Sequence, residues 1–332
     1  MIGVTLTSSL IWAGSFPSSS SDSSTPAPVL SSLNYDVVDS GGGDAVTITG
    51  TDLGSAISCT VDGSGVTITG NTDTTLTFTT PSIAAGTYNV QVTTAGGVSN
   101  TLTIEAFSVA ALTPSLWCRA PYAGSPWASA DASSLNLHHA SPGTVGSTVN
   151  GYAPVDFNGT DQQLVSYNTA ASATVNASSL VTTGAGTLLA FANVRTANAF
   201  ASVQGQKAIL TRQASNGFGM TYSSSGLRAY VYDGATKEPG SAIAFSTGAW
   251  HLFAMRWDGT NMYQSVDAGS EASVATSGPS TLNTPLVVGR GHTNTSAFYS
   301  DELVLEVVTA QTCFSTVNIG KIRKVLQCRY AQ

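Results

Sequence analysis

Apolar and polar residues alternate along residues 29–107 in short runs, and each run places its apolar side chains on one face of a strand. Turn-forming residues separate these runs about every ten residues, a spacing typical of a β-sandwich. The first part of the chain is therefore predicted to be an all-β domain. The alternating apolar positions are Val46 and Ile48, Val66 and Ile68, Leu76 and Phe78, Tyr88, Val90 and Val92, and Leu102 and Ile104.

A second and longer series of strand-like runs follows the turn Leu112-Thr113-Pro114. This series has more runs than an immunoglobulin-type sandwich holds, so it predicts a jelly roll. The runs span residues 154–157, 187–194, 208–212, 217–222, 227–233, 250–257, 261–266, 286–289 and 303–308.

Residues 316–330 have helical spacing instead, with Ile319, Ile322 and Leu326 on one stripe. We expect this short C-terminal helix to close one end of the jelly roll. The chain then divides into an N-terminal arm with a Ser/Pro linker (1–27), a first domain (28–108) and a second domain with the helix (109–332). The cations expected in the last turns of the helix, where they complement its dipole, are Lys321, Arg323, Lys324 and Arg329.

Several short motifs in the first domain resemble the IPT/TIG immunoglobulin-like domain. They are Gly-Gly-Asp-Ala-Val-Thr-Ile-Thr-Gly-Thr-Asp-Leu-Gly at 42–54, Thr80-Pro81, Gly-Thr-Tyr-Asn-Val-Gln-Val at 86–92 and Gly-Gly-Val-Ser-Asn at 96–100. The match departs near Tyr35, where many relatives have a proline turn. The resemblance implies a spacer or interaction module of surface and virion proteins, without catalytic residues.

The second domain resembles the LamG-like, concanavalin A-like jelly roll in the order of its motifs. The motifs are Phe-Asn-Gly-Thr-Asp at 157–161, Gly-Ala-Trp-His at 248–251, Arg-Trp-Asp-Gly-Thr at 256–260, Val-Asp-Ala-Gly at 266–269, Leu-Val-Val-Gly at 286–289 and Ser-Asp-Glu-Leu-Val-Leu at 300–305. The inserted Ala268 indicates a slightly different hairpin turn. The fold class is therefore expected to be all-β, with an immunoglobulin-like sandwich, a larger concanavalin A-like jelly-roll sandwich and a short C-terminal helix.

Charge is distributed unevenly along the chain, which has a net charge of −7. All twelve Lys and Arg residues lie at or after Arg119, so the first 118 residues carry eight acidic side chains and no basic one. Nucleic acid is therefore excluded as a partner of this part, because binding to phosphates depends on Lys and Arg. Residues 1–16 are apolar but lack the basic start of an export signal, and we interpret them as a retained arm that docks on a partner. No run reaches the roughly 18 apolar residues of a membrane span.

The cysteines are Cys59, Cys118, Cys313 and Cys328, and their spacing fits neither a disulfide scaffold nor a zinc site. Cys118, Cys313 and Cys328 flank the two ends of the second domain, so two of them could form one bridge. Otherwise the cysteines are expected to be buried thiols.

Candidate catalytic groups are sparse, and we expect the chain not to be an enzyme. Glu302 and Glu306 are expected to share one strand face, but Val304 separates them, and the fuller acidic triplet of glycoside hydrolases of this fold is missing. His138 and His139 point to opposite sides of an extended chain and are expected in an exposed loop. No phosphate loop or dinucleotide motif indicates a cofactor.

Two binding sites are considered, one implied by the LamG resemblance and one indicated by residue types. Asp267 and Asp301 are the nearest candidates for a calcium ion at the sandwich rim, the one metal that the LamG resemblance implies; the alternative is that each aspartate bonds its own turn. On residues 227–233, Arg228, Tyr230 and Tyr232 share one strand face and could contact a sugar by stacking and forked donors. The alternatives are a subunit interface or ordinary strand residues.

The order of arm, linker, spacer and jelly roll predicts a bacteriophage virion surface protein, either a capsid decoration or a fibre-like adhesin. The arm would bind other virion proteins, the chain would form a homo-oligomer assembled in the host cytoplasm, and the jelly roll would contact host-surface polysaccharide with many weak sites. The alternative is a secreted, extracellular carbohydrate-binding protein or a glycoside hydrolase of concanavalin A-like fold.

Overall fold

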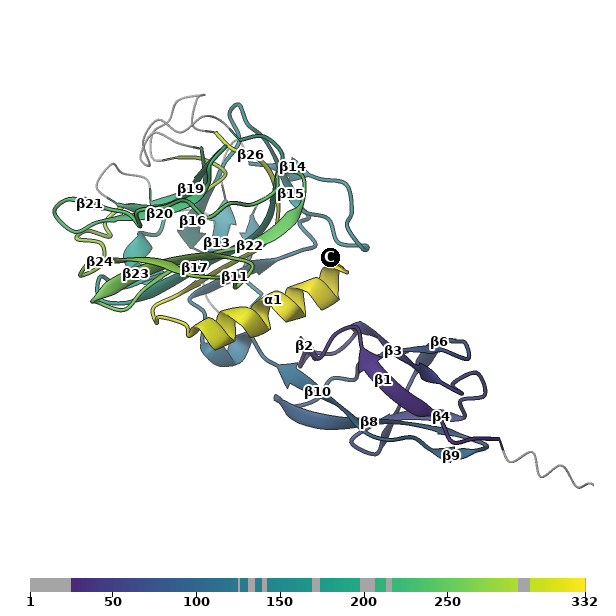
Figure 1. Ribbon diagram of the computed structural model, residues 1–332. Helices are drawn as coiled ribbons and strands as arrows, with labels where there is room; N and C mark the ends of the chain where they lie inside the picture. Colours follow the sequence, from purple (N-terminus) through teal and green to yellow (C-terminus); the bar gives the residue numbers. More distant parts are fainter. Residues whose placement is uncertain are drawn as a thin grey trace, which may run out of the picture.

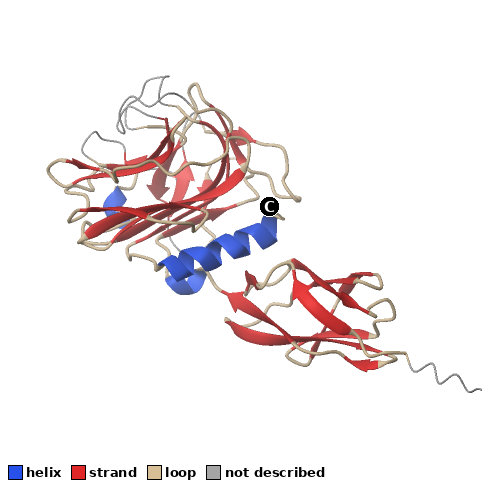
Figure 2. Ribbon diagram, in the orientation of Figure 1, coloured by secondary structure: helices blue, strands red, loops and turns tan. Residues whose placement is uncertain are grey.

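The computed structural model describes residues 25–124, 126–130, 135–138, 142–168, 174–197, 207–212, 217–291 and 299–331. Within these ranges the chain forms an N-terminal β-sandwich and a larger C-terminal β-sandwich, with one α-helix between them (Figure 1). Strands make up most of the regular structure (Figure 2). The predicted all-β fold class with a short C-terminal helix is therefore confirmed. The expected arm and most of the Ser/Pro linker fall on residues 1–24, outside the described residues.

Two sheets pack face to face in the N-terminal sandwich, with strand orders β1-β3-β7-β6 and β2-β10-β8-β4-β5, and β9 pairs with β8. The predicted alternation is present, since Val46, Ile48, Leu76 and Phe78 are fully buried between the sheets. The strands are β1 (Val29–Leu33), β2 (Val37–Asp39), β3 (Ala45–Thr51), β4 (Ser58–Val61), β5 (Ser64–Val66), β6 (Ile68–Asn71), β7 (Thr75–Thr79), β8 (Gly86–Thr94), β9 (Gly97–Val98) and β10 (Leu102–Phe107).

The C-terminal sandwich also has two sheets. The β17 sheet has the order β14-β15-β26-β17-β22-β23-β24, with β11 paired to β26, and the β20 sheet has the order β12-β13-β16-β25-β18-β19-β20-β21. The short 3₁₀ helices are η1 (Ala110–Leu112) and η2 (Ala177–Ser179). The strands are β11 (Leu116–Arg119), β12 (Trp127–Ala128), β13 (Leu135–His138), β14 (Thr144–Val145), β15 (Val155–Asn158), β16 (Leu164–Asn168), β17 (Gly186–Val194), β18 (Lys207–Arg212), β19 (Phe218–Ser223), β20 (Gly226–Tyr232), β21 (Thr236–Lys237), β22 (Trp250–Trp257), β23 (Asn261–Val266), β24 (Ala272–Ala275), β25 (Leu286–Val288) and β26 (Asp301–Ala310).

Large apolar side chains fill the space between these two sheets. Trp257 is fully buried there against Phe218, and its indole N–H donates to the Thr182 carbonyl at 3.0 Å. Full burial of a large apolar side chain contributes about 1.5–3 kcal/mol, so this core stabilises the sandwich. One expectation is corrected here: His138 ends strand β13 and is half-buried, because β13 pairs with both β12 and β16, whereas its neighbour His139 lies outside the described residues.

A β-bulge interrupts the long central strand β26. Phe191 of β17 pairs with Glu306, but the next residue, Ala192, pairs with Val304, so Leu305 is an extra residue. Because side chains alternate along a strand, the extra residue reverses which face the later side chains occupy. Leu305 lies on the opposite face of the β17 sheet, yet Val307, two residues later, lies in the core between the sheets.

Helix α1 (Thr316–Tyr330) covers that opposite face rather than one end of the jelly roll, which corrects the expected position. Ser315 is the N-cap of this helix, and its hydroxyl accepts a hydrogen bond from the Asn318 backbone N–H at 3.1 Å. Its apolar stripe, with Ile319, Ile322 and Leu326, is buried against the β17 sheet. Figure 1 shows the other side of the helix facing the N-terminal sandwich. No helix within the described residues is long and apolar enough to cross a membrane.

All four cysteines are free, so the bridge considered between two of Cys118, Cys313 and Cys328 is not formed. The three candidates lie in different surroundings. Cys118 is in the core between the two large sheets, Cys328 belongs to the core cluster of the N-terminal sandwich, and Cys313 accepts a hydrogen bond from Arg256 at 3.3 Å. The ends of the second domain do meet, but helix α1 turns Cys328 away from that domain.

Candidate functional sites in the C-terminal sandwich and at the domain junction

Strand β20 places the predicted sugar-binding residues on the face opposite to the core. Leu227, Ala229 and Val231 belong to the core cluster, whereas Arg228, Tyr230 and Tyr232 take the alternate positions. Tyr230 is 0% exposed, so its ring offers no surface to a sugar in this conformation. Arg228 and Tyr232 are partly exposed, and Arg228 pairs with Glu238 at 3.2 Å. Sugar contact at Arg228 and Tyr232 stays a prediction.

The two candidate calcium ligands are held by basic side chains of the protein. Asp301 accepts the Arg195 Nε–H at 2.6 Å, and the same guanidinium reaches Asp156 at 2.7 Å. Asp267 pairs with His251 and with Arg323, which lies 3.3 Å away. Within the described ranges no group of three His, Cys, Asp or Glu side chains could hold a metal ion. The structure therefore lends no support to a calcium site at Asp267 or Asp301.

Ser246, His251 and Asp267 form a chain that has the order of a catalytic triad. His251 Nδ1 lies 2.7 Å from Asp267 Oδ2, and His251 Nε2 lies 3.1 Å from Ser246 Oγ. The hydrogen bonds from His251 and from the Leu252 backbone lower the pKa of Asp267, although burial acts in the opposite direction. A catalytic histidine needs a free Nε2 lone pair to take the serine proton.

The backbone of Ser246 blocks that role. Its carbonyl oxygen lies 3.0 Å from His251 Nε2, and a carbonyl oxygen can only accept a hydrogen bond. The contact is favourable only when Nε2 carries a hydrogen, which it then donates to the carbonyl. The Asp267 carboxylate also only accepts, from Nδ1, so both contacts are hydrogen bonds only when both ring nitrogens carry hydrogens, and such a ring has no lone pair for the serine proton. His251 therefore clamps the turn that contains Ser246 to the hairpin that contains Asp267. His251 and Asp267 belong to two of the motifs that carried the LamG resemblance, at 248–251 and 266–269.

We expect a fluorophosphonate probe, which labels activated serines, to leave the full-length chain unmodified. The reason is that His251 cannot withdraw the Ser246 proton while it donates to the Ser246 carbonyl. The measurement is intact-protein mass spectrometry after incubation with the probe, with Ser246→Ala as the matched control. Labelling of the native chain that disappears in Ser246→Ala would show a working triad and overturn this interpretation.

Glu302 and Glu306 do not share a strand face, which corrects the sequence-based expectation. The bulge at Leu305 lies between them and sends their side chains to opposite faces of the β17 sheet. Glu302 is fully buried, its Oε1 accepts the Ser300 hydroxyl at 3.0 Å, and burial raises its pKa to about 8. Glu306 instead accepts hydrogen bonds from Trp117 and Tyr330, each at 2.8 Å. A paired-carboxylate glycosidase geometry is therefore not formed by these two residues.

Arg329 at the end of helix α1 joins the two sandwiches through buried ion pairs. Its guanidinium donates to Asp39 of β2 in the N-terminal sandwich and to Glu306 of β26 in the C-terminal sandwich. The exposed fractions of the three side chains are 5%, 12% and 2% in that order. Burial alone would lower the pKa of Arg329, but the charges of Glu306, Tyr330 and Asp39 raise it. We call Arg329, Asp39 and Glu306 the junction cluster.

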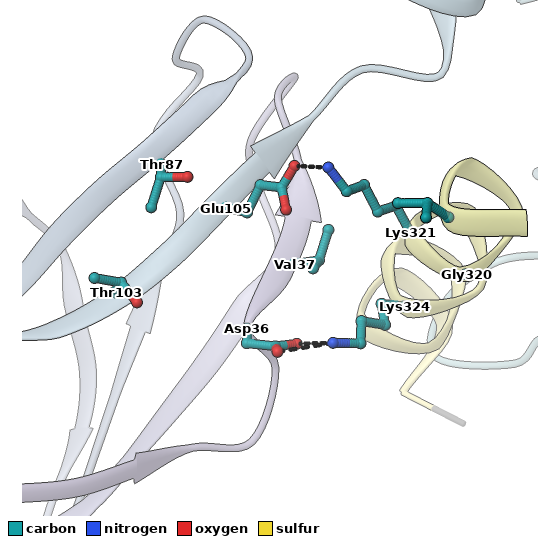
Figure 3. Close-up of a pocket in the computed structure, with 9 residues that line it drawn as sticks. Asp36, Val37, Thr87, Thr103, Glu105, Gly320, Lys321 and Lys324 are labelled. Carbon is teal, nitrogen blue, oxygen red and sulfur yellow. Dashed lines mark hydrogen bonds and ion pairs between the residues drawn. The ribbon is translucent and has the colours of Figure 1, made fainter. Parts of the chain in front are cut away.

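Two further ion pairs connect the helix to the N-terminal sandwich at the edge of a groove of about 420 Å³. Lys321 donates to Glu105 at 2.5 Å, and Lys324 donates to Asp36 at 2.8 Å, as Figure 3 shows. These cations were expected to complement the helix dipole, and their pairing with the N-terminal sandwich was not predicted. The sequence did contain a signal for these pairs. The first domain has acidic residues and no basic residue, so any ion pair that its carboxylates make must use cations from the rest of the chain, and here helix α1 supplies them.

Comparisons with known proteins cover the N-terminal sandwich by sequence. The family model of the IPT/TIG domain matches residues 28–107, which confirms the resemblance seen there. No curated protein matches the sequence.

Solved structures resemble larger parts of the chain at low identity. The binding domain of Paraclostridial Mosquitocidal Protein 1 has a TM-score of 0.48 at 10% identity, covering 63% of this chain and 52% of that chain. Domain 4 of AbnA, a GH43 extracellular arabinanase from Geobacillus stearothermophilus, has a TM-score of 0.40 at 10% identity, covering 56% and 81%. Trypanosoma rangeli sialidase has a TM-score of 0.47 at 14% identity, covering 86% and 49%. This chain thus spans about half the length of the first and third of these proteins.

Proposed function

We propose that this chain is a non-enzymatic surface protein of a bacteriophage virion, either a capsid decoration or a fibre-like adhesin. In this proposal the N-terminal arm binds other virion proteins, the IPT/TIG domain is a spacer, and the C-terminal sandwich presents a carbohydrate-binding surface to host-surface polysaccharide. Several copies in one homo-oligomer would raise the avidity of weak single sites.

The junction cluster is the observation that carries the proposal. A spacer presents a binding domain in a fixed direction only when the two are joined rigidly, and domains joined by a linker alone move relative to each other. Here Arg329 is buried between both sandwiches, and Lys321 and Lys324 add two more pairs. This arrangement suits presentation of a surface at a fixed angle. The clamp role of His251 and the separation of Glu302 from Glu306 favour binding over catalysis.

Quantitative mass spectrometry of purified virus particles from the source tests the virion location. We expect peptides of this chain in the particles, at hundreds of copies for a capsid decoration and at a few to a few dozen for a tail or fibre component. Absence from the particles, with the protein found in the culture medium, would contradict the virion proposal and favour a secreted carbohydrate-binding protein.

Adsorption of the purified full-length chain to host-surface polysaccharide tests the binding role. We expect co-sedimentation that free polysaccharide competes away. Tyr232→Ala should weaken it, because the exposed ring on β20 would no longer stack on a sugar. Tyr88→Ala, which removes a half-buried ring from the N-terminal sandwich, is the matched control and should change nothing. If the native chain does not adsorb, the carbohydrate part of the proposal is wrong.

A further inference from the structure

A cavity of about 320 Å³ lies between the two sandwiches beside the junction cluster. The N-terminal sandwich contributes Gly42 and Asp44 to its lining, and the C-terminal sandwich contributes Arg119 and Tyr152. Gly42 has a φ of +73°, and a Cβ atom there would lie 2.5 Å from the backbone of Pro81 and Ser82. The wall of the cavity at this point therefore requires glycine.

Arg119 provides hydrogen-bond donors that the fold does not use. Its guanidinium lies over the Trp117 ring, 5.1 Å from the ring centroid, and its side chain is 40% exposed. The nearest carboxylate oxygen, on Asp39, is 3.7 Å away, which is too far for a hydrogen bond. In the described part of the chain no side-chain hydrogen bond holds this guanidinium, so its forked N–H groups are available to a ligand. Trp117 is itself fixed by Glu306, so the platform under Arg119 is rigid.

Asp44 provides an acceptor on the opposite wall. Its Oδ2 accepts the Asp39 backbone N–H at 2.9 Å, which leaves Oδ1 for a ligand hydroxyl. Burial raises the pKa of Asp44, although the Asp39 N–H bond acts against this shift. Tyr152 adds an aromatic ring held edge-on against Tyr330, with the ring centroids 5.1 Å apart.

The balance of charges selects the chemical class of the ligand. The cavity lining contains Arg119 and Arg329 together with Asp39 and Asp44, so it has no surplus positive charge that would favour a phosphate or a sulfate. A donor fork, a carboxyl acceptor and an aromatic ring together suit a group that both donates and accepts, which is a hydroxyl on an apolar ring. The larger groove beside the helix differs, because Lys321 and Lys324 are paired there with Glu105 and Asp36.

We propose that the junction cavity binds one sugar unit, with Arg119 and Asp44 contacting its hydroxyl groups. The inference rests on the proposed carbohydrate-binding role and gives it a location different from strand β20. A ligand in this cavity would contact both sandwiches, so its binding would also strengthen the junction.

Isothermal titration of the full-length chain with D-glucose, D-galactose, N-acetylglucosamine and D-mannose tests the inference. We expect at least one of these sugars to bind with a dissociation constant in the millimolar range, because a single sugar unit is small and makes few contacts. Arg119→Met keeps the apolar stem over Trp117 but removes the donors, and it should weaken binding about tenfold or more. Lys324→Met is the matched control, because it removes a cation from the same junction outside the cavity, and its affinity should equal that of the native chain.

Three results would overturn the inference: none of the four sugars binds, Arg119→Met binds as tightly as the native chain, or Lys324→Met loses as much affinity as Arg119→Met. Urea unfolding of Arg119→Met checks that this variant is folded. If it is not folded, the titration is repeated with Arg119→Lys, which keeps the positive charge but loses the forked pair of donors. Adsorption to polysaccharide distinguishes failure of the junction-cavity inference from failure of the proposed carbohydrate-binding function. If Tyr232→Ala abolishes adsorption while Arg119→Met retains it, only the junction cavity is excluded.

Discussion

Replacement of Arg329 by methionine should lower the free energy of unfolding by about 3–5 kcal/mol, the usual effect of removing one partner from a buried ion pair. The variant leaves Asp39 and Glu306 facing each other across the junction without their shared cation. Glu306, which is 2% exposed, cannot reach bulk water without separation of the two sandwiches, whereas Asp39 is 12% exposed and keeps Arg119 at 3.7 Å. Urea unfolding at neutral pH, followed by tryptophan fluorescence, measures the loss.

Two variants make this result specific to the junction cluster. Lys324→Met removes a pair whose side chains are 48% and 61% exposed, so its effect should stay below about 1 kcal/mol. Glu306→Gln in the Arg329→Met background removes one of the stranded charges and should recover part of the stability, because the amide can still accept from Tyr330. Equal losses for Arg329→Met and Lys324→Met would mean that burial of the junction cluster has no energetic consequence.

Loss of the cluster should also separate the two sandwiches in solution. Val37 and Phe107 of the N-terminal sandwich share an apolar cluster with helix α1, and Cys328 of the helix belongs to the core cluster of the N-terminal sandwich. This interlocking predicts that the native chain unfolds in one transition. Urea unfolding of Arg329→Met should show two transitions, one for each sandwich. A single transition would mean that the apolar contacts alone hold the sandwiches together.

Local patterning was sufficient to predict most of the strands. Runs such as residues 187–194 and 250–257 are mostly apolar, and they became the neighbouring strands β17 and β22. Short strands such as β12 and β14 were not predicted, because a strand of two residues shows no periodicity. The fold class therefore followed from the sequence, and the edges of the sheets did not.

The candidate sites were harder to predict because they depend on contacts between distant residues. The bulge at Leu305 has no local signature, yet it decides that Glu302 and Glu306 face apart. Asp267 was a candidate calcium ligand because of the LamG resemblance. Its actual partner, His251, lies on the preceding strand of the hairpin, and composition does not show which residues the strand register brings together. Arg329 bonds Asp39 across 290 positions of sequence, a contact that only the packing of helix α1 creates.

Glu302→Gln should make the protein more stable at pH 8, by on the order of 4 kcal/mol. Glu302 is fully buried in the β17 sheet, and among the described residues its Oε2 has no hydrogen-bond partner. Burial raises the pKa of Glu302 from 4.5 to about 8. Glutamine has the same shape as glutamate and no ionisable group. It therefore removes the free-energy cost of either protonating this buried carboxyl at pH 8 or burying its charge.

The sign of the pH dependence follows from these two pKa values. Below about pH 4.5 the carboxyl is protonated in both the folded and the unfolded chain, so Glu302 adds no pH dependence. Between pH 4.5 and about 8 the unfolded chain releases the proton and the folded chain retains it, so the free energy of unfolding falls as the pH rises. Above about pH 8 both states are ionised and the contribution levels off. The charges that face this carboxyl are those of Arg195, Lys207 and Asp301, and burial outweighs their effects.

Urea unfolding of the native chain and of Glu302→Gln at a series of pH values from 4 to 9 tests the argument directly, because the two stability curves should meet near pH 4.5 and diverge toward pH 8. Glu238→Gln is the matched control, since Glu238 is partly exposed beside Arg228 and its removal should leave the slope of the curve unchanged. A Glu302→Gln protein that is less stable than the native chain by a constant amount at every pH would contradict the prediction. That result would mean that Glu302 is ionised and paired in the folded state, most directly with Lys207 or Arg195, and that the sandwich interior admits a charge at this position.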